Sequence, residues 1–436
     1  MAVAKQSQND KRYAWSRGDK QLAAALLVFC MAASGAWQKM THFRHASLSI
    51  PQIAAPSPNG FDTFVRAGAP PCLSWTSWPT NSAVSAAAMS RETWLTIPPT
   101  AQQLAHFAQA PATNAPAIIL LRQGLSQQTL APQYRQLQHF HREWGHLHDL
   151  SGAVEATSYV QAAHGQYTSA LHASIDGIDM SVRLGHGAGF QHENCSTACA
   201  DDCRRPVWYM ASRLKSTDAR YASLRLSAIE AKRDTFAEIM THEKWFSQSI
   251  IIPANNIPSR RHMLLNPGSS LRDRKYAILG LDEVLDSYTT YIDGAIAAVH
   301  QPYSPAVIKA PPEAVSELQT NLDVSLREMW CNWCRSTADN NLLAATLALH
   351  AYKLDHGSYP AALSSLVPHY LPAVPGDPFS PGQLQYRLQG NGYALYSIGP
   401  DGKDDGGTAA IDPQNPQMPY RIATSSRGDI VAGVNE

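Results

Sequence analysis

Cysteine is the residue type whose spacing in this chain points most directly to chemistry. Apart from Cys30, the sequence contains six cysteines, at positions Cys72, Cys195, Cys199, Cys203, Cys331 and Cys334. Thiols can pair as disulfides, ligate a metal or carry redox chemistry, and the compartment of the protein decides among these uses. In an exported chain, an even number of cysteines predicts up to three disulfides, with a connectivity that the sequence does not give.

The segment from His192 to Cys203 supports a second interpretation, because three of the cysteines follow one another at intervals of four residues beside a histidine. Thiolate and imidazole ligands can hold zinc. We favour disulfides, because this spacing matches no zinc motif and oxidising compartments consume thiols. Cys331 and Cys334 have the CxxC spacing of a redox site, but no strand precedes them. We expect them to form a structural bridge, to the 195–203 segment for example.

Sequence motifs for hydrolytic catalysis are incomplete in this chain. His242 and Glu243 begin like the zinc-protease motif HExxH, but Phe246 stands where the second histidine ligand is required. The histidine-rich run over residues 139–148 has no pair of histidines four residues apart, and the chain has no GxSxG nucleophile motif. We therefore predict no catalytic residue.

The N-terminal region has the features of an export or membrane segment. Residues 22–37 read LAAALLVFCMAASGAW, and five basic residues precede them, namely Lys5, Lys11, Arg12, Arg17 and Lys20. This excess of positive charge places residues 1–20 in the cytoplasm and the chain after residue 40 outside. Residues 21–37 are either a transmembrane anchor or a cleaved signal peptide. We favour a single-pass protein of the inner (cytoplasmic) membrane whose bulk is periplasmic or extracellular.

The composition excludes some classes of partner. Thirty-five basic residues balance thirty-five acidic ones, and only 16% of the residues are charged. A nucleic-acid-binding protein needs an excess of positive charge, so we expect no nucleic-acid partner. With 436 residues, of which 44% are hydrophobic, the chain is long enough for two or three domains with sizeable cores.

Changes in composition along the chain predict its organisation. Residues 38–118 mix Pro, Ser, Ala and Thr and have the character of a partly ordered tether. Residues 119–311 show apolar side chains at intervals of three and four and predict an α-helical domain. A proline-rich stretch at 302–312 marks its end. We expect a long helix and a small module over 312–412 and a C-terminal tail over 413–436.

The helical domain contains one hairpin that the sequence marks clearly. Apolar periodicity over residues 153–184 is interrupted at His164 and Gly165, which predicts two antiparallel helices. We expect further helices over 223–246 and 275–300. The residues Gly165, Tyr167, Ala170, Leu171 and Gly177 resemble the centre of a tetratricopeptide repeat, in which small residues let paired helices approach closely. Because the first half of that repeat pattern is absent, we describe the domain as TPR-like.

The expected C-terminal module combines a helix with a β-hairpin. Helical periodicity ends at Gly357, and a short helix is expected over 362–367. Two runs of alternating hydrophobicity, at 384–388 and 393–398, flank the sequence Gly390-Asn391-Gly392. This spacing and turn chemistry predict an antiparallel hairpin. The fold class that we expect is therefore α+β, with a body of helical hairpins and a small C-terminal module.

Three phrases in this module resemble the globular domain of the major pseudopilin of bacterial type II secretion. They are YKLDHGSYP at 352–360, LVPHYLPAVPGDPF at 366–379 and LYSIGPDGKD at 395–404. The resemblance implies a calcium site in the loop after the last of these strands, with four matching ligands: the carbonyl of Ile398 and the carboxylates of Asp401, Asp404 and Asp405. Calcium accepts six to eight oxygen ligands in flexible geometry. Thr408 stands where the family has a further aspartate, and the alternative is an Asx-rich turn with solvated carboxylates.

The position of this module departs from the pseudopilin family. In a pseudopilin the membrane helix runs directly into the globular domain, whereas here about 300 residues lie between the two regions, and the prepilin processing motif is missing. The whole arrangement resembles a group of uncharacterised bacterial membrane-anchored proteins. Our hypothesis is a non-enzymatic scaffold or binding protein of the cell envelope, with an unidentified protein or envelope partner. The alternatives are an exported metal-dependent hydrolase and an accessory component of a type II secretion or pilus-like system.

Overall fold

A computed structural model of the chain describes residues 20–22, 24–28, 30–31, 34, 50–51, 53–69, 71–75, 98–132, 137–254, 262, 265–271, 274, 282–312, 325–416 and 421–432. The chain divides into two compact units. One comprises Met1–Ile50 and Gln248–Asp286, and the other comprises Pro51–Ser247 and Ser287–Glu436.

The first unit contains the expected membrane segment. Residues 21–37 lie only partly within the described part of the chain, and the described residues between Lys20 and Ser34 are helical. The large apolar side chains there are exposed, for example Leu27 and Val28. Among the residues that the structure describes, no helix has both the length and the apolar character needed to cross a bilayer.

The second unit is built mainly from helices. They are α2 (Gly60–Gly68), α4 (Ala101–His106), α5 (Ala110–Thr113), α6 (Ala115–Leu125), α7 (Leu137–Ala163), α8 (Tyr167–Leu184), α9 (Phe190–Met210), α10 (Ser216–Glu230) and α16 (Leu326–His356). Two more helices, α11 (Phe236–Ala254) and α14 (Asp282–Ala298), belong to this unit up to Ser247 and from Ser287 respectively. Short 3-10 helices lie at Ala211–Arg213, Pro305–Val307 and Leu363–Leu366.

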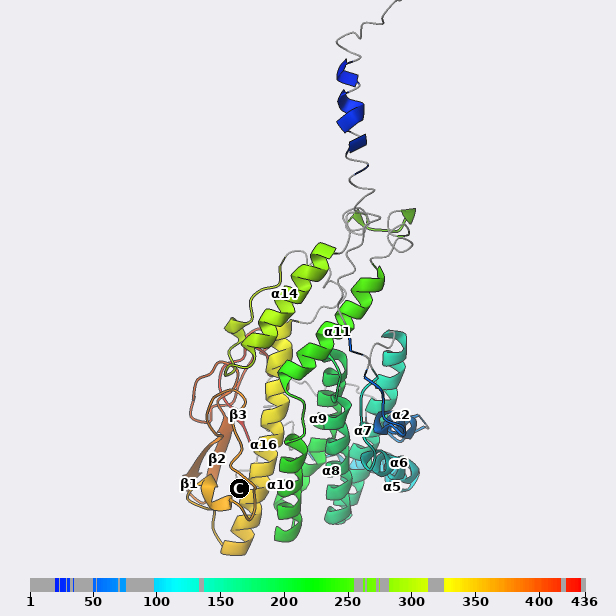
Figure 1. Cartoon of the computed structure of the whole chain (residues 1–436). Coiled ribbons are helices and arrows are strands. Elements are labelled where there is room, and N and C mark those ends of the chain that lie inside the picture. Colours follow the sequence, from blue (N-terminus) through cyan, green and yellow to red (C-terminus); the bar gives the residue numbers. More distant parts are fainter. Residues whose placement is uncertain are drawn as a thin grey trace, which may run out of the picture. The chain divides into compact units, whose positions relative to one another are not determined.

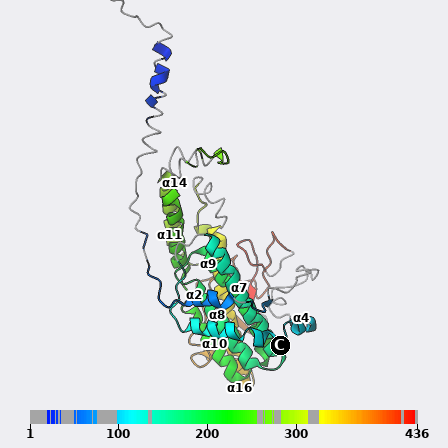
Figure 2. The ribbon, with the colours of Figure 1, turned by 90° about the vertical axis from the view of Figure 1, so that its right-hand side faces the viewer.

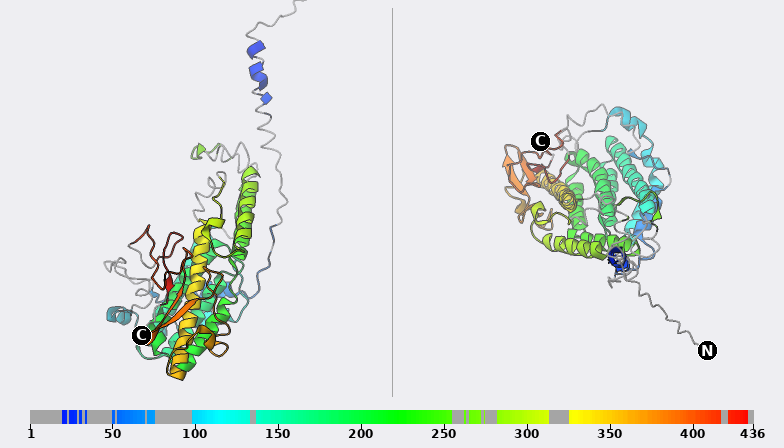
Figure 3. Two further views of the ribbon diagram at one scale, coloured as in Figure 1. Left: turned by 90° about the vertical axis from the view of Figure 1, so that its left-hand side faces the viewer. Right: turned by 90° about the horizontal axis from the view of Figure 1, so that it is seen from above.

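Within this unit the long helices form one layer. Helices α7, α8, α9, α10 and α16 run side by side, and the strands lie beyond α16 (Figure 1). A view turned by 90° shows α2 and α6 crossing the layer, where α2 contacts α7 and α6 contacts α8 (Figure 2). Seen from above, the helices follow one another from α6 to α16 (Figure 3). The second unit is therefore a helical layer with a small sheet attached to its α16 edge.

The helical hairpin expected over residues 153–184 is confirmed. Helix α7 ends at Ala163 and α8 begins at Tyr167, and between them Gly165 adopts φ = +76°, a left-handed conformation that favours glycine. Close packing of α8 against α9 depends on a second glycine. A Cβ atom at Gly177 would lie 2.4 Å from the Sγ atom of Cys203, so only a residue without a side chain fits there.

The prediction of a single helix over residues 223–246 is wrong, because the structure contains parts of two helices, α10 and α11, in that stretch. Thr235 and Glu238 form a capping box: the Glu238 carboxylate accepts from the Thr235 N–H at 2.8 Å, and the Thr235 hydroxyl accepts from the Glu238 N–H at 3.3 Å. These bonds satisfy two donors at the start of α11 and therefore stabilise a new helix start inside the apolar pattern.

The region expected to be a partly ordered tether, residues 38–118, contributes helices to the second unit. Phe61 and Phe64 of α2 are completely buried, and the Asn59 side chain caps this helix by accepting from the Phe61 N–H at 3.1 Å. Residues 38–49 and 76–97 of the region lie outside the described residues. The boundary expected near residue 311 falls inside the second unit.

The C-terminal part forms the small sheet. Strands β1 (Gln385–Gln389) and β2 (Gly392–Ser397) pair in antiparallel register with Gln389 opposite Gly392, so the predicted hairpin is confirmed. Strand β3 (Ile430–Val431), from the segment expected to be a tail, pairs with the end of β2. The described residues thus form a mostly helical α+β fold with a three-stranded antiparallel sheet in the order β1-β2-β3.

Candidate functional site

Charged side chains are concentrated inside the helical layer, where α9 faces α7, α10 and α16. We call the following ten residues the charge cluster: Arg204, Arg205, Arg233 and Arg335 with Glu155, Glu193, Asp201, Asp202, Glu230 and Asp339. The side chains of the four arginines are at most 15% exposed. Because burying a charge is costly unless it is paired, the pairing of these groups is the main electrostatic feature of the unit.

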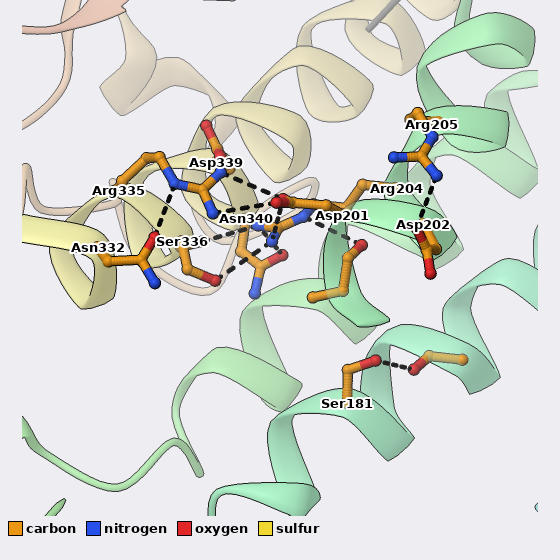
Figure 4. Close-up of polar contacts among 12 residues, drawn as sticks. Ser181, Asp201, Asp202, Arg204, Arg205, Asn332, Arg335, Ser336, Asp339 and Asn340 are labelled. Carbon is orange, nitrogen blue, oxygen red and sulfur yellow. Dashed lines mark hydrogen bonds and ion pairs between the residues drawn. The ribbon is translucent and has the colours of Figure 1, made fainter. Parts of the chain in front are cut away.

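Asp201 on α9 joins this helix to α16. Its carboxylate accepts from Arg335 of α16 at 3.0 and 3.2 Å and from Arg204 at 3.0 Å (Figure 4). Arg335 also donates to Asp339, one turn further along α16, at 2.9 Å. Although burial raises the pKa of Asp201, Arg335 and Arg204 outweigh that effect and hold it at about 2. Asp201 is therefore ionised throughout the physiological pH range.

Arg204 is the largest fully buried side chain of the unit, with 1% of it exposed. Its guanidinium donates to the Ser336 carbonyl at 2.8 Å and to the Asn340 side-chain oxygen at 3.2 Å, both on α16 (Figure 4). Asn340 in turn donates to Glu230 of α10 at 2.6 Å. One continuous set of hydrogen bonds therefore connects α9, α16 and α10, and a charge-assisted bond is roughly twice as strong as a neutral one.

Two further arginines each contact two carboxylates. Arg205 donates to Glu155 of α7 at 2.7 and 2.8 Å and to Asp202 at 2.6 Å. Arg233, after the end of α10, donates to Glu230 at 2.7 Å and to Glu193 of α9 at 3.1 Å. Burial raises the pKa of Glu155 and that of Glu193 to about 7, against the opposing effects of Arg205 and Arg233 respectively. These two carboxyl groups therefore titrate near neutral pH.

The cysteines of α9 point away from α16. Cys199 donates to the Leu147 carbonyl of α7 at 3.7 Å, and Cys203 contacts Gly177 of α8. The Sγ atoms of Cys195 and Cys199 are 3.9 Å apart. Asp201 and Arg204, on the opposite side of α9, are the residues that reach α16. The structure therefore does not bring the α9 cysteines to the two cysteines of α16.

The two cysteines of α16, Cys331 and Cys334, are buried near Tyr303 and Asp377. Burial raises the pKa of Cys331 to about 12 and raises that of Cys334 as well. A thiol with a raised pKa forms little thiolate, which favours a structural role for these cysteines over a redox one. Every cysteine is a thiol in this structure, Cys72 being half-buried, and disulfide formation stays a prediction.

In the histidine- and cysteine-rich part of α9, described side chains contact other residues of the unit. Across the described residues, no group of three or more His, Cys, Asp or Glu side chains is placed to hold a metal ion. The ring of His192 packs edge-on against that of Phe61, with their centroids 5.6 Å apart. Side chains 137–141 lie outside the described part, so His139 and His141 are not placed. Glu243, the acid of the incomplete HExxH motif, is buried and accepts from the Phe190 N–H at 3.0 Å.

The aspartate-rich loop after β2 is closed by its own hydrogen bonds. Asp401 accepts from the Lys403 N–H at 3.1 Å and from the Gly428 N–H at 3.3 Å. Asp404 accepts from the Gly406 N–H at 3.0 Å. These bonds to the residue two positions on are Asx turns, the alternative that the sequence left open. The Ile398 N–H donates to the buried carboxylate of Asp377 at 2.9 Å.

The sequence did not reveal Asp429, which lies directly before β3 and contacts the same loop. Its buried carboxylate accepts from the Gly407 N–H at 2.6 Å and from the Asp405 N–H at 3.3 Å. It lies in the segment expected to be a tail, so its spacing from the loop gave no signal. Calcium binding by Ile398, Asp401, Asp404 and Asp405 stays a prediction, and of these residues Asp401 and Asp404 use their carboxylates to accept from backbone amides.

Sequence reasoning also missed the charge cluster. One local signal was present in the sequence. Two aspartates and two arginines lie within five residues of a long helix, in the run Asp201-Asp202-Cys203-Arg204-Arg205. Their partners are 50 to 134 residues away in the chain, at Glu155 and Arg335. Comparisons of the chain with protein-family models, with curated proteins and with solved structures find no match.

Proposed function

We propose that this protein is a non-enzymatic scaffold of the bacterial cell envelope, anchored in the cytoplasmic membrane through residues 21–37 and binding a protein partner with its exported part. The observation that carries the proposal is the continuity of α16. This helix of 31 residues packs on α9 and α10 and also leads directly into the pseudopilin-like module at Gly357. The helical layer and the module therefore move together, as the parts of a scaffold must.

The charge cluster supports a structural role over a catalytic one. Its ionised groups are turned toward one another, and the central arginine, Arg204, is closed off from solvent by α9 and α16. A catalytic acid or base must come within hydrogen-bond reach of a substrate. Groups that hold helices together inside the unit do not meet this condition, whereas they fix the helical layer in one arrangement.

The packing of the module onto α10 supports the same conclusion. Ser223 of α10 donates to the Tyr370 carbonyl at 2.6 Å, and Arg220 contacts His369 at 2.7 Å. The Tyr370 hydroxyl donates to Asp355 at the end of α16 at 2.8 Å. The module is thus fixed to the helical layer at two places, through α16 and through α10.

The location can be tested with the full-length chain carrying a C-terminal tag in a bacterial host. The proposal predicts recovery in the membrane fraction and digestion of the tagged part by protease added to spheroplasts. Recovery as a cytoplasmic protein that is protected from the protease would overturn it. Zinc in the purified chain, measured by elemental analysis, would favour the metal-dependent hydrolase instead.

Partner binding can be tested in the same cells with a photo-cross-linking amino acid on the exposed face of α10. Tyr221 and Leu224 are suitable positions, being 39% and 36% exposed. The matched control is Leu226, which lies on the same helix and is 1% exposed. A scaffold should give a discrete protein adduct from an exposed position and none from the control. Identical patterns from all three positions would contradict binding through this face.

A further inference from the structure

Two arginines of the charge cluster each serve two buried carboxylates. We call Glu155, Arg205 and Asp202 the first triad and Glu193, Arg233 and Glu230 the second triad. Glu155 and Glu193 are 1% and 2% exposed, so water does not compensate their charge. Each triad therefore contains one more carboxyl group than its guanidinium can neutralise.

The rest of the cluster does not correct this imbalance. Arg204 and Arg335 are matched by Asp201 and Asp339, which gives two positive and two negative charges. Four arginines consequently face six carboxyl groups, and full ionisation would leave two negative charges inside the helical layer. A buried charge without a partner costs several kcal/mol, and a carboxyl group avoids that cost by taking up a proton.

In the second triad, the hydrogen bonds indicate which of the two carboxyl groups is protonated. Glu230 accepts from Arg233 at 2.7 Å and from Asn340 at 2.6 Å, whereas among the described residues only Arg233 donates to the Glu193 carboxylate, at 3.1 Å. The other charged group that faces Glu193 is Asp234, which is also acidic. Glu193 is therefore the carboxyl group with the weakest cationic support. Its pKa of about 7 agrees with this placement.

The first triad has more neighbours. Tyr159 of α7 and Tyr209 of α9 lie close to it, and Ser151 donates to Asp202 at 2.6 Å. The Nε2 atom of His148 is 3.6 Å from the Asp202 carboxylate, and the His148 side chain is 36% exposed. His148 thus faces the Asp202 end of this triad. Glu155 is nevertheless the more deeply buried of the two carboxyl groups.

We propose that each triad holds one proton at neutral pH, on Glu193 and on Glu155, and that the attachment of α9 to α7 through Glu155 and to the end of α10 through Glu193 weakens as these protons are lost. A glutamate in an unfolded chain releases its proton near pH 4.3. Between there and about pH 7 the folded chain binds more protons than the unfolded chain, so its stability falls as the pH rises. The layer is thus a pH-sensitive device that is tightest in mild acid.

The test compares thermal unfolding of the full-length protein with that of Glu193→Gln at about pH 6 and about pH 8.5. Glutamine has the shape of a protonated glutamate and cannot ionise. Because the unfolded glutamate is already ionised at about pH 6, we expect the variant to be the more stable protein at both pH values, and its advantage in the unfolding midpoint to grow at the higher pH. Glu155→Gln should show the same trend. Glu193→Gln less stable than the wild type at both pH values would overturn the proposal, because glutamate would then be needed as an anion.

The matched control is Asp293→Asn, which removes an acid from the surface ion pair with Lys244. Its difference from the wild type should not change over the same pH range. Infrared spectroscopy of the wild type provides a measurement that needs no folded variant. A carbonyl stretch of a protonated carboxyl group should be present at about pH 6 and disappear by about pH 8.5. No such band at the lower pH would refute the assignment.

Discussion

The helical layer and the C-terminal module both bury carboxylates, but they neutralise them in different ways. In the helical layer, arginines do so: Asp339 is held by Arg335. In the module, backbone amides do so: Asp377 accepts from the Phe379 and Ile398 N–H groups, and Asp429 from those of Asp405 and Gly407. The difference follows from the backbone around each carboxylate.

A helix uses almost all of its N–H groups in its own hydrogen bonds, so a carboxylate inside a helical layer finds few free donors. It is therefore met by a long cationic side chain, either from a neighbouring turn, as Asp339 is by Arg335, or from another helix, as Glu155 is by Arg205. Turns and strand ends leave N–H groups unused, and a short aspartate can accept them within its own loop. The layer thus neutralises its carboxylates with cationic side chains, whereas the module satisfies its buried carboxylates with backbone N–H groups.

The largest effect is expected from Arg204→Ala. The change leaves Asp201 with one arginine, exposes the Ser336 carbonyl to a cavity and removes the link to Asn340. We expect a loss of about 3 to 5 kcal/mol in the free energy of unfolding, measured by denaturant titration. Arg213→Ala is the control on the surface just beyond α9, with an expected loss below about 1 kcal/mol. Equal losses would mean that the cluster contributes no more than surface charge.

Asp377→Ala tests the module in the same way. Asp377 is 3% exposed and accepts from the Ser397 hydroxyl at 2.6 Å and from two backbone N–H groups. Its removal leaves these donors unsatisfied, so we expect a loss of about 2 to 3 kcal/mol. Asp377→Asn keeps one acceptor oxygen and should lose less. If the asparagine variant is as unstable as the alanine variant, the negative charge itself matters, and the contrast between the two regions is weaker than we describe.

Gly177→Ala tests whether the layer needs the close approach of α8 and α9. The added methyl group would meet Cys203, and overpacking of this kind costs about 1 to 2 kcal/mol. The double variant with Cys203→Ala should recover part of the loss, because the sulfur atom is then absent. Losses that simply add in the double variant would show that another contact is responsible. Denaturant titration of the four proteins gives the answer.

The smallest effect is expected from removing calcium. Hydrogen bonds from backbone N–H groups to Asp401, Asp404 and Asp429 close the loop after β2, so its closure does not require an ion. We expect a calcium chelator to change the free energy of unfolding by less than about 1 kcal/mol. A fall of several degrees in the unfolding midpoint, restored by calcium and abolished by Asp401→Ala, would instead support the calcium site implied by the pseudopilin resemblance.

Local signals in the sequence predicted the local features of the fold. Gly165 ended a helical pattern, and Gly390 with Asn391 joined two alternating strands, because turn chemistry depends on neighbouring residues. The break between α10 and α11 was missed although Thr235 and Glu238 have the spacing of a capping box. The apolar pattern continues across that break, so periodicity alone did not show it.

Contacts between distant residues were not predictable in the same way. The Arg335 contact with Asp201 spans 134 residues, and the role of Asp429 depends on β3 returning to the end of β2. The α9 cysteines illustrate the same difficulty. Their spacing suggested disulfides or zinc, but the fold places them against α7 and α8, where Cys203 fits beside Gly177. Only the packing of the helices decides which side of α9 faces which neighbour.

Helix α16 also has a mechanical consequence. With 31 residues and a rise of 1.5 Å per residue, it is a strut about 46 Å long. Its first half is clamped by Asp201 and Arg204, and its far end carries the module. A force applied to the sheet would be transmitted along the axis of α16 to the contacts with α9, because no flexible linker lies between them. The ionic hydrogen bonds from Asp201 and Arg204 to α16 would then resist the sliding of α16 along α9.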